Sequence, residues 1–239
     1  GRHQGYLGAG GLIMLGRTAG GLFWMFRYLE RSENVARLME AGLRIALTRN
    51  TDADAEWTSV LSAAGARAGY LERHESFEAA RIIDYLLRDR ANPSSVLSVV
   101  AAARANARMV RTALTREVFE ATNESYMALR GALERPVSER RLPEVLALIR
   151  QQSALVTGAH QGTVLRNDGY DFARLGTYIE RADNTARILD VKYYVLLPSV
   201  SLVGSSLDNV QWETILRAVS AYRSFRWLNE AAVGPRGIA

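Results

Sequence analysis

The chain has 239 residues, of which 48% are hydrophobic, and its 30 basic and 25 acidic residues give a formal net charge of +5. This length allows one large helical domain or two small ones with a sizeable core, and the hydrophobic content excludes intrinsic disorder. The absence of cysteine excludes disulfides, thiolate metal ligands and a cysteine nucleophile, and is typical of a reducing compartment.

The positive charge does not indicate a nucleic-acid partner. Nearly all the cations are arginine, because Lys192 is the only lysine, and acidic residues alternate with them along the same segments. A nucleic-acid binder would instead gather its cations into a stripe with aromatic platforms. No stretch reaches the roughly 18 apolar residues of a membrane-spanning helix. The sequence therefore predicts a cytoplasmic protein that binds neither nucleic acid nor a membrane.

The first half of the chain reads as a series of helices. Residues 1–13 are rich in glycine and lack a helical period, so we expect a disordered or non-native segment there. Apolar spacing predicts a long helix over about residues 21–48. Shorter helices are expected after residue 54, with interruptions at Gly65 and Gly69, and over residues 76–87.

The middle of the chain carries clear helix starts. Asn92 followed by Pro93 predicts a capped start, ahead of a helix over residues 96–114. Thr115 predicts a kink or a second start, with a helix continuing to residue 133. Another helix is expected over residues 143–157.

The last third is expected to hold a long helix over residues 172–197 and a final helix over residues 210–228, with a frayed tail at 230–239. No segment alternates with the period of two that marks a strand. The sequence predicts an all-α multi-helix bundle or array. It contains one helical domain over residues 14–229 and two equivalent long motif helices, at about 21–48 and 172–197.

One motif occurs twice. Residues 28–39 read YLERSENVARLM and residues 178–189 read YIERADNTARIL, with six of twelve positions identical. Amphipathic helices explain the apolar matches but not the recurring polar ones. At helical spacing the polar positions of each copy form one stripe. If the two helices face each other, their carboxylates and guanidinium groups form an interlocked network.

Three interpretations of this motif compete. The favoured one is an arginine–carboxylate lattice that fixes helix register, or a solvated face, because helical ion pairs are common. The second is a polar pocket for a small ligand or a partner's peptide. The third is a carboxylate metal site, which the missing Glu-x-x-His and the nearby arginines disfavour, so neither a metal nor another cofactor is expected.

Recognised catalytic patterns are missing, so no catalytic residue is assigned. The three histidines lack the H-E-x-x-H spacing, the serines lack a nucleophile elbow, and no phosphate-binding Gly-x-x-x-x-Gly-Lys loop occurs. A further polar cluster, formed by Arg104, Asn106 and Arg108, either joins the motif network or lies on an exposed helix face.

Three segments together resemble the bacterial alpha-E domain family, an uncharacterised family of α-helical proteins with a Glu-Arg motif. They read FWMFRYLERSENVARLME, NPSSVLSVVAAARANARMVR and LRNDGYDFARLGTYIERADNTARILD, in this order. The resemblance covers about residues 14–228. Family members usually continue with further helices, so it implies a C-terminally truncated chain.

The resemblance also implies a functional setting, since such proteins are often encoded beside ATP-grasp-like ligases and transglutaminase-like proteins. We expect an accessory or scaffold protein that acts with such a ligase in peptide synthesis or modification. The alternative is an enzyme or a small-ligand-binding protein, in which Glu30 and Glu180 act as acid and base and the arginines hold an anionic substrate. The candidate motif and ligand-binding residues are Glu30, Arg31, Glu33, Asn34, Arg37, Arg104, Asn106, Arg108, Glu180, Arg181, Asp183, Asn184 and Arg187.

Overall fold

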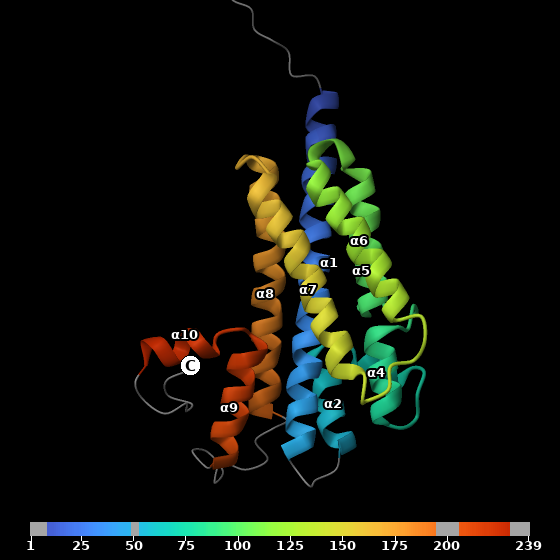
Figure 1. Ribbon diagram of the computed structural model, residues 1–239, viewed down its shortest axis with the longest axis vertical. Helices are drawn as coiled ribbons and strands as arrows, with labels where there is room; N and C mark the ends of the chain where they lie inside the picture. Colours follow the sequence, from blue (N-terminus) through green and yellow to red (C-terminus); the bar gives the residue numbers. More distant parts are fainter. Residues whose placement is uncertain (1–8, 49–52, 195–205, 230–239) are drawn as a thin grey trace, which may run out of the picture.

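The computed structural model describes residues 9–48, 53–194 and 206–229, and every regular element in these ranges is helical (Figure 1). The all-α prediction is therefore confirmed. Within the same ranges, no helix combines the length and apolar character that crossing a bilayer requires.

Helix α1, Ala9–Thr48, is the central element and runs beside α8, Asp168–Tyr194, along much of its length (Figure 1). It also contacts α2, α5, α7 and α9. The remaining elements are α2 (Ala53–Ala63), α3 (Arg67–Leu71), α4 (Ala79–Leu87), α5 (Val96–Met109), the 3-10 turn η1 (Arg111–Ala113), α6 (Arg116–Ala132), α7 (Leu142–Thr163), α9 (Ser206–Ala218) and α10 (Tyr222–Leu228).

Both motif helices begin earlier than predicted. Helix α1 already includes residues 9–13, where the sequence predicts a disordered or non-native segment. Glycine weakens a helix interior by only about 1 kcal/mol, whereas proline stops it, and the first proline of the chain is Pro93. Helix α8 begins directly after Asn167, whose side chain accepts a hydrogen bond from the backbone of Tyr170. Some of our predictions concern residues outside the described ranges, namely 1–8, 195–197 and 230–239.

The start of α5 corrects one prediction. Ser95, not Asn92, caps this helix, because its hydroxyl accepts a hydrogen bond from the backbone N–H of Ser98. The Asn92 side chain instead accepts from Ser94 and donates to the buried carbonyl of Tyr85. The predicted new start at Thr115 is confirmed, since its side chain caps α6.

The predicted final helix is two helices. Helix α9 ends at Ala218 and α10 begins at Tyr222, and between them Ser220 has a φ of 61°. No glycine or proline marks this break. A left-handed serine is uncommon, so the sequence carries no signal for the turn.

Most of the buried apolar residues form two clusters, and both involve α1. One cluster contains Leu29 and the residues before it in α1, and the other begins at Val35. Helix α8 contributes Ala173 to the first cluster and Ile188 to the second. The polar motif residues therefore occupy the seam between α1 and α8, at the level where one apolar cluster gives way to the other.

Candidate functional site

The two motif helices approach closely because small residues line their contact. A methyl group at Gly176 in α8 would clash with the backbone carbonyl of Phe23 in α1. Ala173, one turn earlier on the same face, is fully buried. This close approach brings the polar side chains of the two helices within direct hydrogen-bonding distance.

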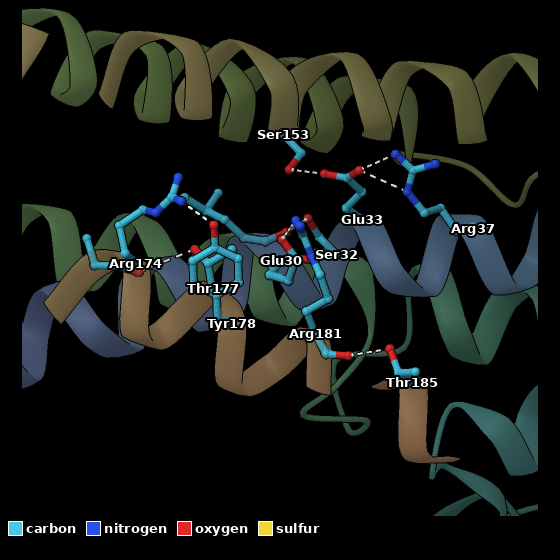
Figure 2. A network of polar contacts seen from close by, with 12 residues as sticks. Glu30, Ser32, Glu33, Arg37, Ser153, Arg174, Thr177, Tyr178, Arg181 and Thr185 are labelled. Atoms are coloured by element: carbon cyan, nitrogen blue, oxygen red, sulfur yellow. Dashed lines mark hydrogen bonds and ion pairs between the residues drawn. The ribbon is translucent and has the colours of Figure 1, made fainter. Parts of the chain in front are cut away.

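The two Glu-Arg dipeptides form reciprocal ion pairs across the seam. Arg31 donates through Nε and Nη2 to the two carboxylate oxygens of Glu180, at 2.6 and 2.8 Å. Arg181 donates in the same way to Glu30, at 2.8 and 3.0 Å (Figure 2). The glutamate of each copy therefore accepts a two-pronged hydrogen bond from the arginine of the other, the strongest arrangement for such a pair.

A third arginine breaks the equivalence of the two copies. Arg27 donates through Nε to Glu180 at 2.9 Å, so Glu180 is held by two guanidinium groups. The corresponding position in the second copy is Thr177, whose hydroxyl donates to the backbone carbonyl of Ala173 instead. Glu30 therefore has a single arginine partner.

This difference reverses the electrostatic balance of the two carboxylates, although both are less than a tenth exposed. Burial raises the pKa of Glu30, and the hydrogen bond and charge of Arg181 offset only part of that rise. Burial also raises the pKa of Glu180. There, Arg31 and Arg27 together outweigh the effect and hold the pKa below its ordinary value.

The next turn of each motif holds an internal ion pair. In α1, Arg37 donates to one oxygen of Glu33 at 2.9 and 2.5 Å, while the Ser153 hydroxyl of α7 donates to the other oxygen at 2.8 Å (Figure 2). In α8, Arg187 donates to Asp183 at 2.6 Å. The first copy is thereby tied to a third helix.

Comparison with known proteins agrees with the helical fold and with the presence of a Glu-Arg motif. The family Alpha-E, described as a predicted alpha-helical domain with a conserved ER motif, matches residues 14–239. The chain belongs to the Alpha-E family. No curated protein and no solved structure matches it.

In this Alpha-E chain, a Glu-Arg dipeptide alone does not make a buried pair. The sequence contains three further Glu-Arg dipeptides, at residues 72–73, 134–135 and 139–140, and all six side chains are exposed. Only the dipeptides at 30–31 and 180–181 lie on the facing sides of α1 and α8. The reciprocal pairing therefore depends on the position of a Glu-Arg dipeptide in the seam and not on its residue types alone.

A small cavity adjoins the reciprocal pairs. Its volume is about 80 Å³, and its polar lining comprises Arg31, Asn34, Ser94, Glu180, Asp183, Asn184 and Arg187. The buried Asn34 amide nitrogen has no hydrogen-bond partner in the described part of the chain. The cavity has room for ordered water. It is well below the roughly 300 Å³ of typical small-molecule pockets.

Arg187 lies at this cavity beside an unusual backbone. Gly65 has a φ of 68°, and a methyl group built on it would collide with the Arg187 guanidinium. Glycine is therefore favoured there for its left-handed conformation, whereas the flexible end of the Arg187 side chain can move aside for a methyl group.

The middle polar cluster forms a separate set of contacts. Arg104 donates to Asn123 of α6 at 2.7 Å and lies over the ring of Tyr126, 4.7 Å from its centroid. Asn106 donates to a carbonyl of its own helix, and Arg108 is exposed. Among the described residues, no hydrogen bond or ion pair joins these three to the two motif copies. Arg104 connects α5 to α6, Asn106 bonds within α5, and Arg108 faces solvent.

Sequence reasoning missed two members of the network, Arg27 and Ser153. Arg27 lies four residues before Arg31, on the same helical face, so the helical period offered a signal. Ser153 offered none, because its contact to Glu33 depends on how α7 crosses α1.

The described residues show no other constellation typical of catalysis. No three His, Cys, Asp or Glu side chains in these ranges converge as metal ligands. His160 is buried between Phe26 and Tyr170, and burial together with the nearby Arg174 lowers its pKa to about 4. It is therefore neutral at pH 7 and packs as an aromatic ring.

Proposed function

We propose that this Alpha-E protein is an accessory or scaffold subunit, and that its partner is an ATP-grasp-like ligase of peptide synthesis or modification. The observation that carries the proposal is the saturation of both motif carboxylates by arginines of the opposite copy. The twin motif holds α1 against α8 and thereby keeps the outer surface of the helical array in a single conformation.

The alternative, an enzyme with the motif as its active site, fits the geometry less well. A general base must come within about 2.6–3.2 Å of the group it deprotonates. Glu30 and Glu180 are 7% and 3% exposed, and both oxygens of each already accept hydrogen bonds from arginine. The adjoining cavity of about 80 Å³ leaves no room for a peptide substrate.

The outer face of α8 supports an interaction with another protein. Phe172, Leu175 and Ile179 follow one another at helical spacing and are 38%, 47% and 41% exposed. Exposed apolar side chains gathered on one face typically mark a protein interface. We propose that this stripe binds the ligase. That the partner is an ATP-grasp-like ligase is what the family resemblance implies.

Co-purification from the native bacterium tests the proposal. We expect the tagged chain to retain an ATP-grasp-like ligase at stoichiometric level, identified by mass spectrometry. The double variant Leu175→Glu/Ile179→Glu should lose the ligase. As a control, Met127→Glu places a charge on an exposed apolar residue of α6 and should retain it. Recovery of the chain alone, or of a transglutaminase-like protein in place of the ligase, would contradict the proposal.

One observation favours a ligand at the motif itself, namely the unpartnered amide of Asn34 beside the small cavity. A ligand there would consist of only a few non-hydrogen atoms. Mass spectrometry of small molecules released by denaturing the purified protein decides between the two functions. A stoichiometric small molecule that Asn34→Leu abolishes would favour ligand binding over a scaffold role.

A further inference from the structure

A second, larger cleft lies between α1, α7, α9 and α10, and its lining in α1 begins about two turns after the reciprocal Glu-Arg pairs. Its volume is about 310 Å³. We call it the arginine cleft after its lining guanidinium groups, which belong to Arg37, Arg44, Arg150, Arg217 and Arg223. Glu40 is the one acidic residue among the described lining residues.

Carboxylates balance only part of this positive charge. Glu33 pairs with Arg37, and Glu213 pairs with Arg217. Glu40 is shared between Arg150, at 3.5 Å, and Arg44, at 3.9 Å. Arg150 therefore shares its one carboxylate with a second arginine, so Glu40 does not fully balance its charge.

Two of the arginines have donors to spare. The Nε of Arg150 is buried and has no hydrogen-bond partner among the described residues. Buried donors are almost always satisfied, so an orphaned guanidinium N–H indicates a missing acceptor. Arg223 is exposed and forms no ion pair with the described part of the chain. Both side chains line the cleft, where the Arg150 side chain is 35% exposed and Arg223 is exposed, so their accessible atoms can meet an incoming oxygen ligand.

The turn between α9 and α10 closes one wall of the cleft. The left-handed Ser220 ends α9 and redirects the chain, so that Tyr222 and Arg223 of α10 line the same space as Arg217 of α9. The Arg217 guanidinium lies over the Tyr222 ring, 4.2 Å from its centroid. This stacking fixes the orientation of the Arg217 guanidinium, so the side chain loses less conformational entropy when a ligand binds to it.

We propose that the arginine cleft binds a small molecule carrying phosphate or carboxylate groups. Clustered arginines recognise such oxyanions through paired N–H donors. A volume of about 310 Å³ lies at the lower end of the roughly 300–1,000 Å³ of small-molecule sites. The inference is independent of the proposed ligase partner and of the reciprocal pairs. Of the motif residues it involves Arg37, whose own partner is Glu33.

Calorimetric titration of the full chain with pyrophosphate, and separately with citrate, tests the proposal. We expect saturable one-to-one binding of at least one of them, weakening as sodium chloride is added because salt screens the charges. Preference for pyrophosphate would identify phosphate as the group recognised, and preference for citrate would identify carboxylate. Failure of both anions to bind would overturn the site.

Matched variants locate the binding. Arg150→Gln and Arg223→Gln should each weaken binding about tenfold or more, as expected for the loss of one charge-assisted pair. Arg116→Gln removes the same charge from an exposed ion pair on α6 and should leave binding unchanged. Arg223 is exposed, so its variant tests the site even if Arg150→Gln does not fold. Equal weakening by Arg116→Gln and Arg223→Gln, or no effect of Arg223→Gln, would overturn the proposal.

Discussion

In α1 the motif glutamate, Glu30, is held by one arginine, whereas its counterpart in α8, Glu180, is held by two. The Glu-Arg dipeptide and the asparagine and arginine that follow it are the same in the two copies, whereas Glu33 corresponds to Asp183. The difference in arginine partners arises at the residue directly before the motif, where Arg27 corresponds to Thr177. The same Glu-Arg dipeptide can thus hold two carboxylates whose pKa values shift in opposite directions, because a neighbouring position decides the balance between burial and charge.

The copies differ again in the following turn. The Glu33–Arg37 pair is largely shielded from solvent and tied to α7, with side-chain exposures of 17% and 24%. The corresponding Asp183–Arg187 pair is 38% and 44% exposed. The first copy is therefore the better anchored in this turn, although Glu180 of the second copy is the better paired of the two glutamates.

The largest effect is expected at Glu180. Its replacement by alanine leaves Arg27 and Arg31 facing each other without a carboxylate in a partly buried seam. Breaking a buried pair in this way should lower the free energy of unfolding by about 3–5 kcal/mol, measured by urea denaturation. The control is Glu134→Ala, in an exposed Glu-Arg dipeptide, which should change stability by less than about 0.5 kcal/mol. Equal effects of the two substitutions would contradict a buried lock.

Glu30→Gln should have a smaller effect than Glu180→Gln. Glutamine keeps an oxygen that accepts from Arg181 and also removes the unfavourable burial of a charge. We expect a loss of about 1–2 kcal/mol for Glu30→Gln. Urea denaturation of both glutamine variants in the same buffer measures the difference. A Glu30 variant as unstable as the Glu180 variant would show that Arg27 adds nothing.

The contribution of each internal ion pair to the free energy of unfolding should increase with its burial. Arg37→Ala removes the partner of Glu33 and should cost about 1 kcal/mol or slightly more, whereas Arg187→Ala breaks an exposed pair and should cost less than about 1 kcal/mol. Thermal denaturation of both variants gives the order. Greater destabilisation by Arg187→Ala would mean that its contact with Gly65 outweighs the ion pair.

The smallest expected effect is a difference between the two glutamates in how they make the free energy of unfolding depend on pH. The pKa of Glu30 is raised above 4.5 in the folded state, so its contribution is fully present below 4.5 and is lost as pH rises through the folded pKa. The pKa of Glu180 is lowered, so its contribution is present above 4.5 and is lost as pH falls through the folded pKa. Compared with the unsubstituted protein, Glu30→Gln should therefore have a urea midpoint that varies less with pH above pH 4.5. The midpoint of Glu180→Gln should vary less with pH below pH 4.5. The opposite assignment would contradict the two pKa directions.

The helical period and the repeated letters were sufficient to predict the all-α class, the two long motif helices and the possibility of an interlocked network. They did not reveal which carboxylate meets which arginine, because that register depends on the contact of Gly176 with Phe23, residues far apart in the chain. The turn at Ser220 carries no glycine or proline signal. The arginine cleft was missed for the same reason as the register, since four helices must come together before its arginines become neighbours.

The reciprocal lock is tested most directly by a double-mutant cycle between Arg31 and Glu180, measured by urea denaturation, because urea, unlike guanidinium, does not screen charge. Arg31 and Glu134 provide the control cycle, since Glu134 is exposed and belongs to another Glu-Arg dipeptide. We predict a coupling energy of about 1–3 kcal/mol for Arg31 with Glu180, and additivity for the control. Additivity within about 0.5 kcal/mol for Arg31 and Glu180 would contradict the account.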